Sequence, residues 1–134
     1  MEFHYVLKYI GLFYLESDRM IEKVNLSSSA NTISELFQYL KVGQLNDHML
    51  NIIVAENRIL DFHTHEESDE MFYVIEGKMQ IEFDENLVEL HAGDFLVVPK
   101  GKRHRPVCKT LVKCLLIEKS GTLTKDNTGG TYSE

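Results

Sequence analysis

The sequence predicts a mainly all-β protein with a closed or doubled antiparallel sheet, and three observations lead to this fold class. From Met49 onward, apolar and polar residues alternate with a period of two, as they do in strands whose side chains point to opposite faces. Turn residues interrupt this alternation at intervals of roughly 8 to 12 positions, a spacing typical of all-β domains. The interruptions are short, and consecutive hairpins favour one continuous antiparallel arrangement.

Each strand is expected where β-rich residues alternate between two turns. The expected strands are residues 49–55, 58–65, 70–76, 78–84, 87–90, 94–99 and 111–119. The turns between them contain glycine, asparagine or aspartate, which tolerate positive φ or make local side-chain hydrogen bonds. The hairpin turns fall at residues 76–77, 84–86 and 92–94.

A short helix is expected before the strands, over residues 32–40. Thr32 and Glu35 match a capping box, in which the two side chains bond reciprocally to the first backbone N–H groups of a helix. The spacing of the apolar residues in this segment would give the helix one buried face, formed by Ile33, Leu36, Phe37 and Leu40. The serine-rich residues 26–30 are expected to form a loop.

The length of 134 residues fits one domain with one hydrophobic core. We expect the barrel domain to span residues 20–120, with an N-terminal extension of unclear status at 1–19 and a C-terminal tail at 121–134. The apolar run at 9–15 is much shorter than the roughly 20 residues of a membrane span. No small-residue cleavage pattern follows it, so export and membrane anchoring are disfavoured.

The charge and the cysteine content exclude several classes of protein. A net charge of −7 disfavours binding to nucleic acid or to an anionic membrane, since either surface would repel the molecule. The two cysteines, Cys108 and Cys114, form no CxxC motif and are too few for a disulfide framework. A reducing compartment is the simpler interpretation, and we expect a cytoplasmic protein.

Four residues of the β-rich region could converge on a metal ion. His63 and His65 lie two positions apart in an expected strand, so both imidazoles face the same side. Glu70 begins the next expected strand after a short loop. His104 follows much later, where a distant strand of a barrel could supply a fourth ligand.

The spacing of these residues resembles the two sequence motifs of the cupin superfamily. The first motif is matched by His63-x-His65, four residues, Glu70, six residues and Gly77. The second is matched by Gly93, five residues, Pro99-x-Gly101, two residues and His104. Asn57 stands where the first motif often begins with glycine, and Cys108 stands where the second motif often ends with asparagine. Neither position is a metal ligand in the family.

The resemblance implies a jelly-roll barrel, the double-stranded β-helix of cupins. It also implies that His63, His65, Glu70 and His104 bind one divalent transition metal. Three imidazoles and a carboxylate suit Fe, Mn, Ni, Co, Cu or Zn. A divalent ion with one carboxylate keeps a charge near +1 and favours an anionic or oxygen-chelating ligand. The family further implies a homodimer.

Two functions follow as hypotheses. The first is a metalloenzyme acting on a small oxygen-rich metabolite, anionic or sugar-like, by Lewis-acid or oxygen-activating chemistry. Isomerase-like and dioxygenase-like reactions both fit the ligand set. Small one-domain cupins that resemble this chain are often grouped with sugar-phosphate isomerase-like proteins, which is weak evidence for that activity. The alternative is a non-catalytic module that binds or senses a small molecule, because one barrel hosts many functions. A purely structural barrel is the least favoured.

Several further residues are candidates for the surroundings of the metal. Strand alternation places apolar side chains around the ligands, and these expected lining residues are Phe72, Val74, Ile81, Phe83, Phe95 and Val97. Lys100 and Lys102 are candidate anion contacts beside His104. Cys108 is expected to be a buried thiol, and Asp69 a solvated carboxylate. The remaining histidines, His4, His48 and His91, are expected on the surface.

Overall fold

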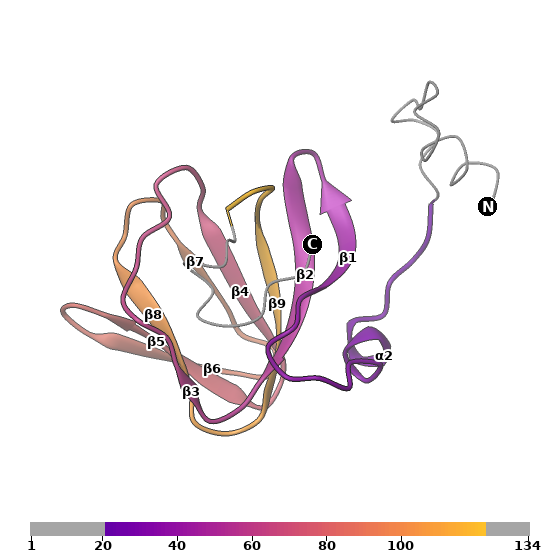
Figure 1. Ribbon diagram of the computed structural model, residues 1–134, viewed down its shortest axis with the longest axis horizontal. Helices are drawn as coiled ribbons and strands as arrows, with labels where there is room; N and C mark the ends of the chain where they lie inside the picture. The colour runs from indigo at the N-terminus through magenta and orange to yellow at the C-terminus, as the bar shows by residue number, and fades with distance from the viewer. Residues whose placement is uncertain (1–20, 123–134) are drawn as a thin grey trace.

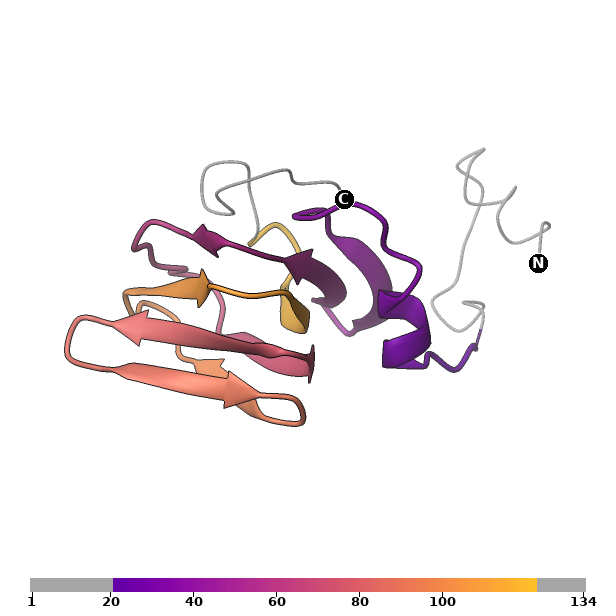
Figure 2. The same cartoon turned by 90° about the horizontal axis from the view of Figure 1, so that it is seen from below.

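The computed structural model describes residues 21–122, which form two antiparallel sheets packed face to face (Figures 1 and 2). The five-stranded sheet has the order β1 (Leu40–Leu45), β2 (His48–Ala55), β9 (Val112–Lys119), β4 (Glu70–Glu76), β7 (Phe95–Val98). The four-stranded sheet has the order β3 (Arg58–Ile59), β8 (His104–Cys108), β5 (Lys78–Phe83), β6 (Leu87–His91). This architecture confirms the predicted β-barrel of the jelly-roll type.

The hydrophobic core lies between the two sheets. In β4, burial alternates along the strand, and Glu70, Phe72 and Val74 point inward while Met71 and Tyr73 lie on the outer side. Ile81 of β5 and Leu116 of β9 meet them from the facing sheet and the neighbouring strand. The alternation read from the sequence therefore corresponds to one buried face per strand.

Gly77 is the single residue that carries the chain from β4 in one sheet to β5 in the other. Its φ of +85° is in the left-handed region, where a side chain is strained. A Cβ atom at this position would also overlap the carbonyl oxygen of Leu111. Glycine is thus required here both for the backbone conformation and for the close approach of the β8–β9 connection.

The predicted helix at residues 32–40 is wrong. The helix of this region is α2 (Leu26–Ala30), in the segment expected to be a loop, and Asn25 caps it by accepting a hydrogen bond from the Ser28 N–H at 2.9 Å. The Thr32 hydroxyl donates to the Ser29 carbonyl oxygen at 2.7 Å, so Thr32 follows the helix instead of beginning one. Ala30 packs α2 against Ile52 on the outer face of the larger sheet (Figure 1).

Tertiary contacts account for this difference. Phe37 has a φ of +66°, which no α-helix accommodates, and its N–H donates to the Val54 carbonyl oxygen at 2.8 Å. From Leu40 onward the chain pairs with β2 as strand β1, which the sequence did not predict. Leu36 and Leu40, expected to be buried, are exposed.

Two further strand predictions need correction. The strand expected at 58–65 is shorter, because only Arg58 and Ile59 form β3, and His63 makes an isolated bridge. A strand not predicted, β8, contains His104 and pairs with β3 and β5. The extension at 1–19 and nearly all of the tail at 121–134 lie outside the described residues. Within residues 21–122, no helix is long and apolar enough to cross a membrane.

Candidate metal centre

His63 and His104 face each other across an isolated antiparallel bridge. The N–H of each residue donates to the carbonyl oxygen of the other at 3.0 Å. Directly opposed residues of antiparallel chains project their side chains to the same face. The two imidazole rings accordingly lie 4.7 Å apart between centroids, both inside the barrel mouth.

The turn before His104 is tied to the strand and loop that carry the other candidate ligands. The Gly101 N–H donates to the His65 carbonyl oxygen at 2.8 Å. The Lys100 N–H donates to a carboxylate oxygen of Asp69 at 2.9 Å. Asp69 is an exposed loop carboxylate, as expected, and it also holds this turn in place. These bonds fix the distance between the two motifs.

Glu70 supplies the fourth group from the beginning of β4. Its carboxylate is buried, 3.0 Å from Nε2 of His104 and 3.6 Å from Nε2 of His65. One ligand atom from each of the four residues, His63, His65, Glu70 and His104, lies within 4.8 Å of the others. The structure therefore brings all four residues chosen from the sequence to one point.

Backbone carbonyl groups orient two of the imidazoles. Nδ1 of His63 lies 2.8 Å from the Asp61 carbonyl oxygen, and Nδ1 of His104 lies 2.8 Å from the Lys102 carbonyl oxygen. A carbonyl oxygen only accepts, so Nδ1 carries the proton in both rings. The lone pair of Nε2 is then directed to the centre, as in histidines that bind metals.

The electrostatic environment favours neutral imidazoles. Burial lowers the pKa of His63 and of His104, and it lowers the pKa of His65 to about 4, with a further contribution from the two neighbouring imidazoles. Burial raises the pKa of the Glu70 carboxyl, since no positive charge stands beside it. A divalent cation would supply the missing charge. Three neutral imidazoles and one carboxylate thus fit a divalent transition metal.

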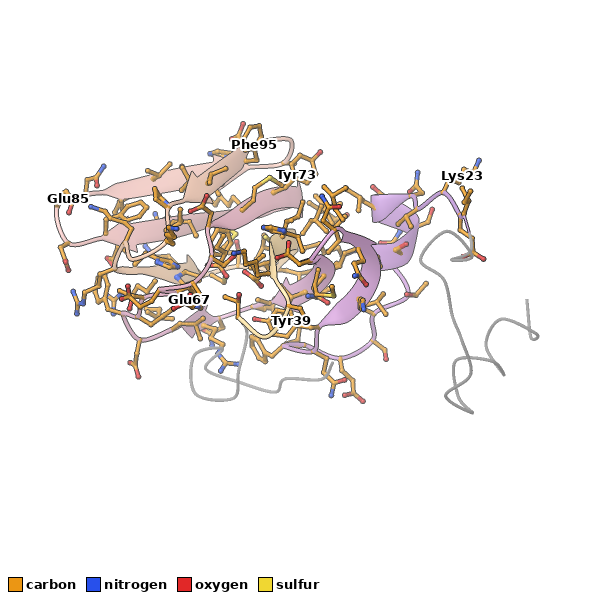
Figure 3. All side chains as sticks on the ribbon, turned by 90° about the horizontal axis from the view of Figure 1, so that it is seen from above. Lys23, Tyr39, Glu67, Tyr73, Glu85 and Phe95 are labelled. Carbon is orange, nitrogen blue, oxygen red and sulfur yellow. The ribbon has the colours of Figure 1, made fainter. Side chains whose placement is uncertain are left out.

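A partly open cavity of about 60 Å³ adjoins this cluster. Most of its walls are apolar side chains from both sheets. Besides His63, His65 and Glu70, the lining has two strongly polar side chains, Tyr39 and Arg58, and the thiols of Cys108 and Cys114. Figure 3 shows Tyr39 on the side of the barrel away from the Phe95 edge. The candidate metal ligands and the cavity therefore form one continuous site.

Comparison with known proteins agrees with this geometry. The family model described as "Cupin domain" matches residues 52–118. The chain belongs to the cupin family. It is 37% identical over 87 residues to the uncharacterized protein YdbB of Bacillus subtilis (strain 168), covering 64% of this chain and 76% of that protein.

Solved structures show the same fold. A cupin-2 domain containing protein from Shewanella frigidimarina aligns with a TM-score of 0.68 and 29% identity, covering 72% of this chain and 93% of that one. Protein NMB1881 from Neisseria meningitidis aligns with a TM-score of 0.66 and 27% identity, covering 74% of this chain and all of that one. Most of this cupin's described barrel thus has a counterpart in each structure.

The sequence reasoning missed a second buried carboxyl group beside the cluster. Glu118 of β9 is 1% exposed. Met71 of β4 pairs with Ile117 of β9, so the next residue pair in this register is Glu70 and Glu118. Apart from the carboxyl of Glu70, no described residue offers a hydrogen bond to either oxygen of the Glu118 carboxyl. Burial and the neighbouring Glu70 raise the pKa of the Glu118 carboxyl well above its usual range.

The alternation of residues in β9 could have predicted that Glu118 is buried. Val112, Cys114 and Leu116 alternate on the buried face of β9, and Glu118 is next on that face. A carboxylate at the end of an apolar face is unusual, because burying a charge is costly. Tyr39 and Arg58 had no comparable sign, because their place in the cavity depends on long-range contacts of β1 and β3.

The expected lining residues fall into three groups. Phe72 lines the cavity, with its ring 6.2 Å from that of His104, and Phe83 is half-buried with its ring 6.5 Å from the same imidazole. Val74 and Ile81 are fully buried in the core between the sheets.

Phe95 and Val97 do not line the barrel, and the expectation for them is corrected. Both are on the outside, 63% and 45% exposed. Phe95 pairs with Tyr73 in the β4–β7 register. The side chain of Tyr73 lies on the opposite face of β4 from Glu70, so the side chain of Phe95 also lies on the outer face of the sheet. Figure 3 shows Phe95 and Tyr73 side by side. Residues 95–98 are all apolar, so the sequence could not tell which alternate pair faces inward.

The basic residues around His104 are engaged with the β5–β6 hairpin. Nζ of Lys102 lies 2.6 Å from a carboxylate oxygen of Glu85, at the hairpin tip labelled in Figure 3. The neighbouring basic residues form the pairs Arg103–Asp84 and Arg105–Glu82. Lys100 is exposed, and neither Lys100 nor Lys102 lines the cavity. The geometry does not favour them as anion contacts.

The two cysteines line the cavity, whereas the other described histidines lie apart from the candidate ligands. Cys108 and Cys114 are free and buried, and burial raises the pKa of the Cys108 thiol to about 11. His91 is exposed and lies 3.1 Å from Glu89, while His48 is half-buried and lies 2.9 Å from Asp47. His4 lies outside the described residues.

Proposed function

We propose that this cupin binds one divalent transition metal through His63, His65, Glu70 and His104 and acts as a metalloenzyme on a small molecule held in the adjoining cavity. The observation that carries the proposal is the convergence of four ligand atoms within 4.8 Å on the wall of that cavity. A structural metal site needs no adjoining chamber. Four protein ligands on an ion that prefers six leave positions open for other molecules.

The bound metal would supply Lewis-acid or oxygen-activating chemistry. The chain's own residues bind and shield the ligand. Apolar walls such as Phe72 and Leu60 exclude water from the chamber. Burial, with the carboxyls of Glu118 and Glu70, raises the pKa of Tyr39 far above its ordinary value, so Tyr39 keeps its hydroxyl proton and can donate it in a hydrogen bond.

Tyr39 and Glu118 also favour an enzyme over the alternative of a non-catalytic binding module. A catalyst needs a group beside the metal that can hold or deliver a proton. The carboxyl of Glu118 beside Glu70 can do so, and Tyr39 on the cavity wall can donate a hydrogen bond to the ligand. The geometry is compatible with isomerase-like and dioxygenase-like reactions alike. The predominantly apolar walls favour a small ligand with few hydroxyl groups over a sugar.

Elemental analysis tests the metal centre. Protein purified without chelator or a His tag should contain about one equivalent of Fe, Mn, Ni, Co, Cu or Zn, and the Glu70→Ala variant should contain far less. Glu89→Ala is the matched control, because Glu89 is an exposed carboxylate outside the cavity. Absence of metal after loading with each of these ions would reject the metalloenzyme and leave the binding module.

The homodimer and the cytoplasmic location stay predictions from the sequence and the family. Sedimentation of the purified protein would test the first. Microscopy of the tagged full chain in its host cell would test the second.

A further inference from the structure

The cavity beside the metal cluster contains one permanently charged cation. Among the described residues that line the cavity, Arg58 is the only basic residue of the lysine or arginine type. Arg58 begins β3, where it pairs with Cys108 of β8, and the next side chain, Ile59, is on the exposed face. The guanidinium group of Arg58 thus belongs to the wall of the chamber that the metal cluster also lines.

Arg58 differs from the other basic side chains near the site. Lys102, Arg103 and Arg105 each form an ion pair with a carboxylate of the β5–β6 hairpin. Within residues 21–122, Arg58 forms no ion pair and donates no hydrogen bond from its side chain, although the whole chain has an excess of acidic residues. A guanidinium has five N–H donors, so a group with this surplus can bind a ligand.

The position of Arg58 is fixed by an aromatic residue in a strained conformation. Its Cζ atom lies 4.3 Å above the ring centroid of Phe37, a cation–π contact. Phe37 has a φ of +66° and is held there by its hydrogen bond to Val54. A phenylalanine rarely adopts this conformation, and such residues concentrate at binding sites. The stacking leaves the edge of the guanidinium, with its N–H groups, available for an anion.

We propose that Arg58 binds the carboxylate of a short aliphatic acid, whose carbon chain lies in the cavity between Arg58 and the metal cluster. The inference rests on the proposed function, since it makes the acid the molecule that the metal centre acts on. The planar guanidinium matches a carboxylate through two parallel hydrogen bonds. Leu60, Phe72 and Met79 provide an apolar surface for the carbon chain.

The size and charge of the chamber restrict the ligand further. A cavity of about 60 Å³ has room for roughly four to six water-sized groups, which corresponds to an acid of a few carbons. A single guanidinium balances one negative charge. A phosphate dianion would bring a second charge between apolar walls, and a neutral sugar would leave hydroxyl groups without partners.

Calorimetric titration with butyrate and with its neutral amide, butyramide, tests the subsite on the protein as purified. Wild type should bind butyrate at least tenfold more tightly than butyramide. Arg58→Gln should lose at least tenfold in butyrate affinity and keep its affinity for butyramide. Arg103→Gln removes the same charge from an exposed position and should match wild type. Arg58→Lys keeps the positive charge but lacks the paired N–H donors of the guanidinium, so its butyrate affinity should fall at least threefold. This variant preserves the test if Arg58→Gln does not fold.

Two results would overturn the subsite. One is equal butyrate affinity for wild type and Arg58→Gln; the other is no binding of any straight-chain acid from propionate to hexanoate by wild type. Metal content measured on the same samples separates this inference from the proposed function. Arg58-dependent butyrate binding in samples that hold no metal would support the subsite and contradict the metal centre.

Discussion

His63 and His104 form two backbone hydrogen bonds with each other across an isolated bridge, although they lie 41 residues apart in the sequence. The bridge joins the first motif to the second, and the Gly101–His65 hydrogen bond reinforces it. The ligand geometry is therefore set by backbone pairing more than by side-chain packing. Removing one imidazole should leave the other ligands in place.

The first prediction concerns the ligands themselves. His104→Ala and His65→Ala should each weaken metal binding at least tenfold while the barrel stays folded, since the backbone bridge does not depend on the rings. Metal content after dialysis and circular dichroism would measure both effects. His91→Ala removes an exposed imidazole and serves as the control. Unchanged metal content in both site variants would refute the assignment.

The second prediction concerns Glu118 in protein stripped of metal with a chelator. Because the folded state raises the pKa of this carboxyl, folding takes up a proton, and its contribution to stability is lost as the pH rises from about 4.5. Glu118→Gln does not titrate, and its amide can donate to Glu70. The variant should therefore be more stable than wild type at pH 8, by about 1–3 kcal/mol.

Urea denaturation at pH 5 and pH 8 provides the comparison. The advantage of Glu118→Gln should shrink at pH 5, where less free energy is needed to keep the wild-type carboxyl protonated. Glu89→Gln, an exposed substitution of the same chemistry, should change stability little at either pH. A Glu118→Gln variant that is less stable than wild type at pH 8 would contradict this account.

The sequence was most informative where local spacing decides the structure. The spacing of His63, His65 and Glu70 and the turn before His104, together with their resemblance to the cupin motifs, were sufficient to choose four residues that the fold brings together. Strand alternation also predicted the inward side of β4. Both inferences depend on a period of two, which is a local property of the chain.

Other features depend on contacts that no local pattern shows. The capping-box pattern at Thr32 and Glu35 was overridden when residues 40–45 paired with β2 and Phe37 bonded to Val54. In β7, four consecutive apolar residues left the inward pair undetermined until the register with β4 was known. Arg58 faces the cavity because β3 pairs with β8, a strand that the sequence did not predict.

The third prediction concerns the thiols. Burial raises the pKa of Cys108 to about 11 and raises that of Cys114 further, so thiolate is scarce in the folded protein at pH 8. Both cysteines should react with a disulfide reagent roughly a hundredfold or more slowly than a free thiol. Denaturant should release two reactive thiols. A fast-reacting Cys108 in folded protein would restore the possibility of a nucleophile four residues after His104.

The fourth prediction compares two glycines that have similar backbone conformations and different surroundings. Gly77 and Gly93 have φ values of +85° and +94°, so alanine at either position incurs left-handed strain of about 1–2 kcal/mol. At Gly93 nothing lies within 4 Å of a new Cβ, whereas at Gly77 the Cβ would overlap the Leu111 carbonyl oxygen and approach Val112 Cα at 3.2 Å.

Gly93→Ala should therefore cost only the strain. Gly77→Ala should cost an additional 1–3 kcal/mol, roughly as overpacking does, or prevent folding, because the atoms it meets are backbone and cannot move as a side chain does. Chemical denaturation of the two variants measures the difference directly. A large cost at Gly77 and a small one at Gly93 would show that the close approach of the β4–β5 turn to the β8–β9 connection contributes to stability. Equal costs would mean that the connection can shift to admit a methyl group.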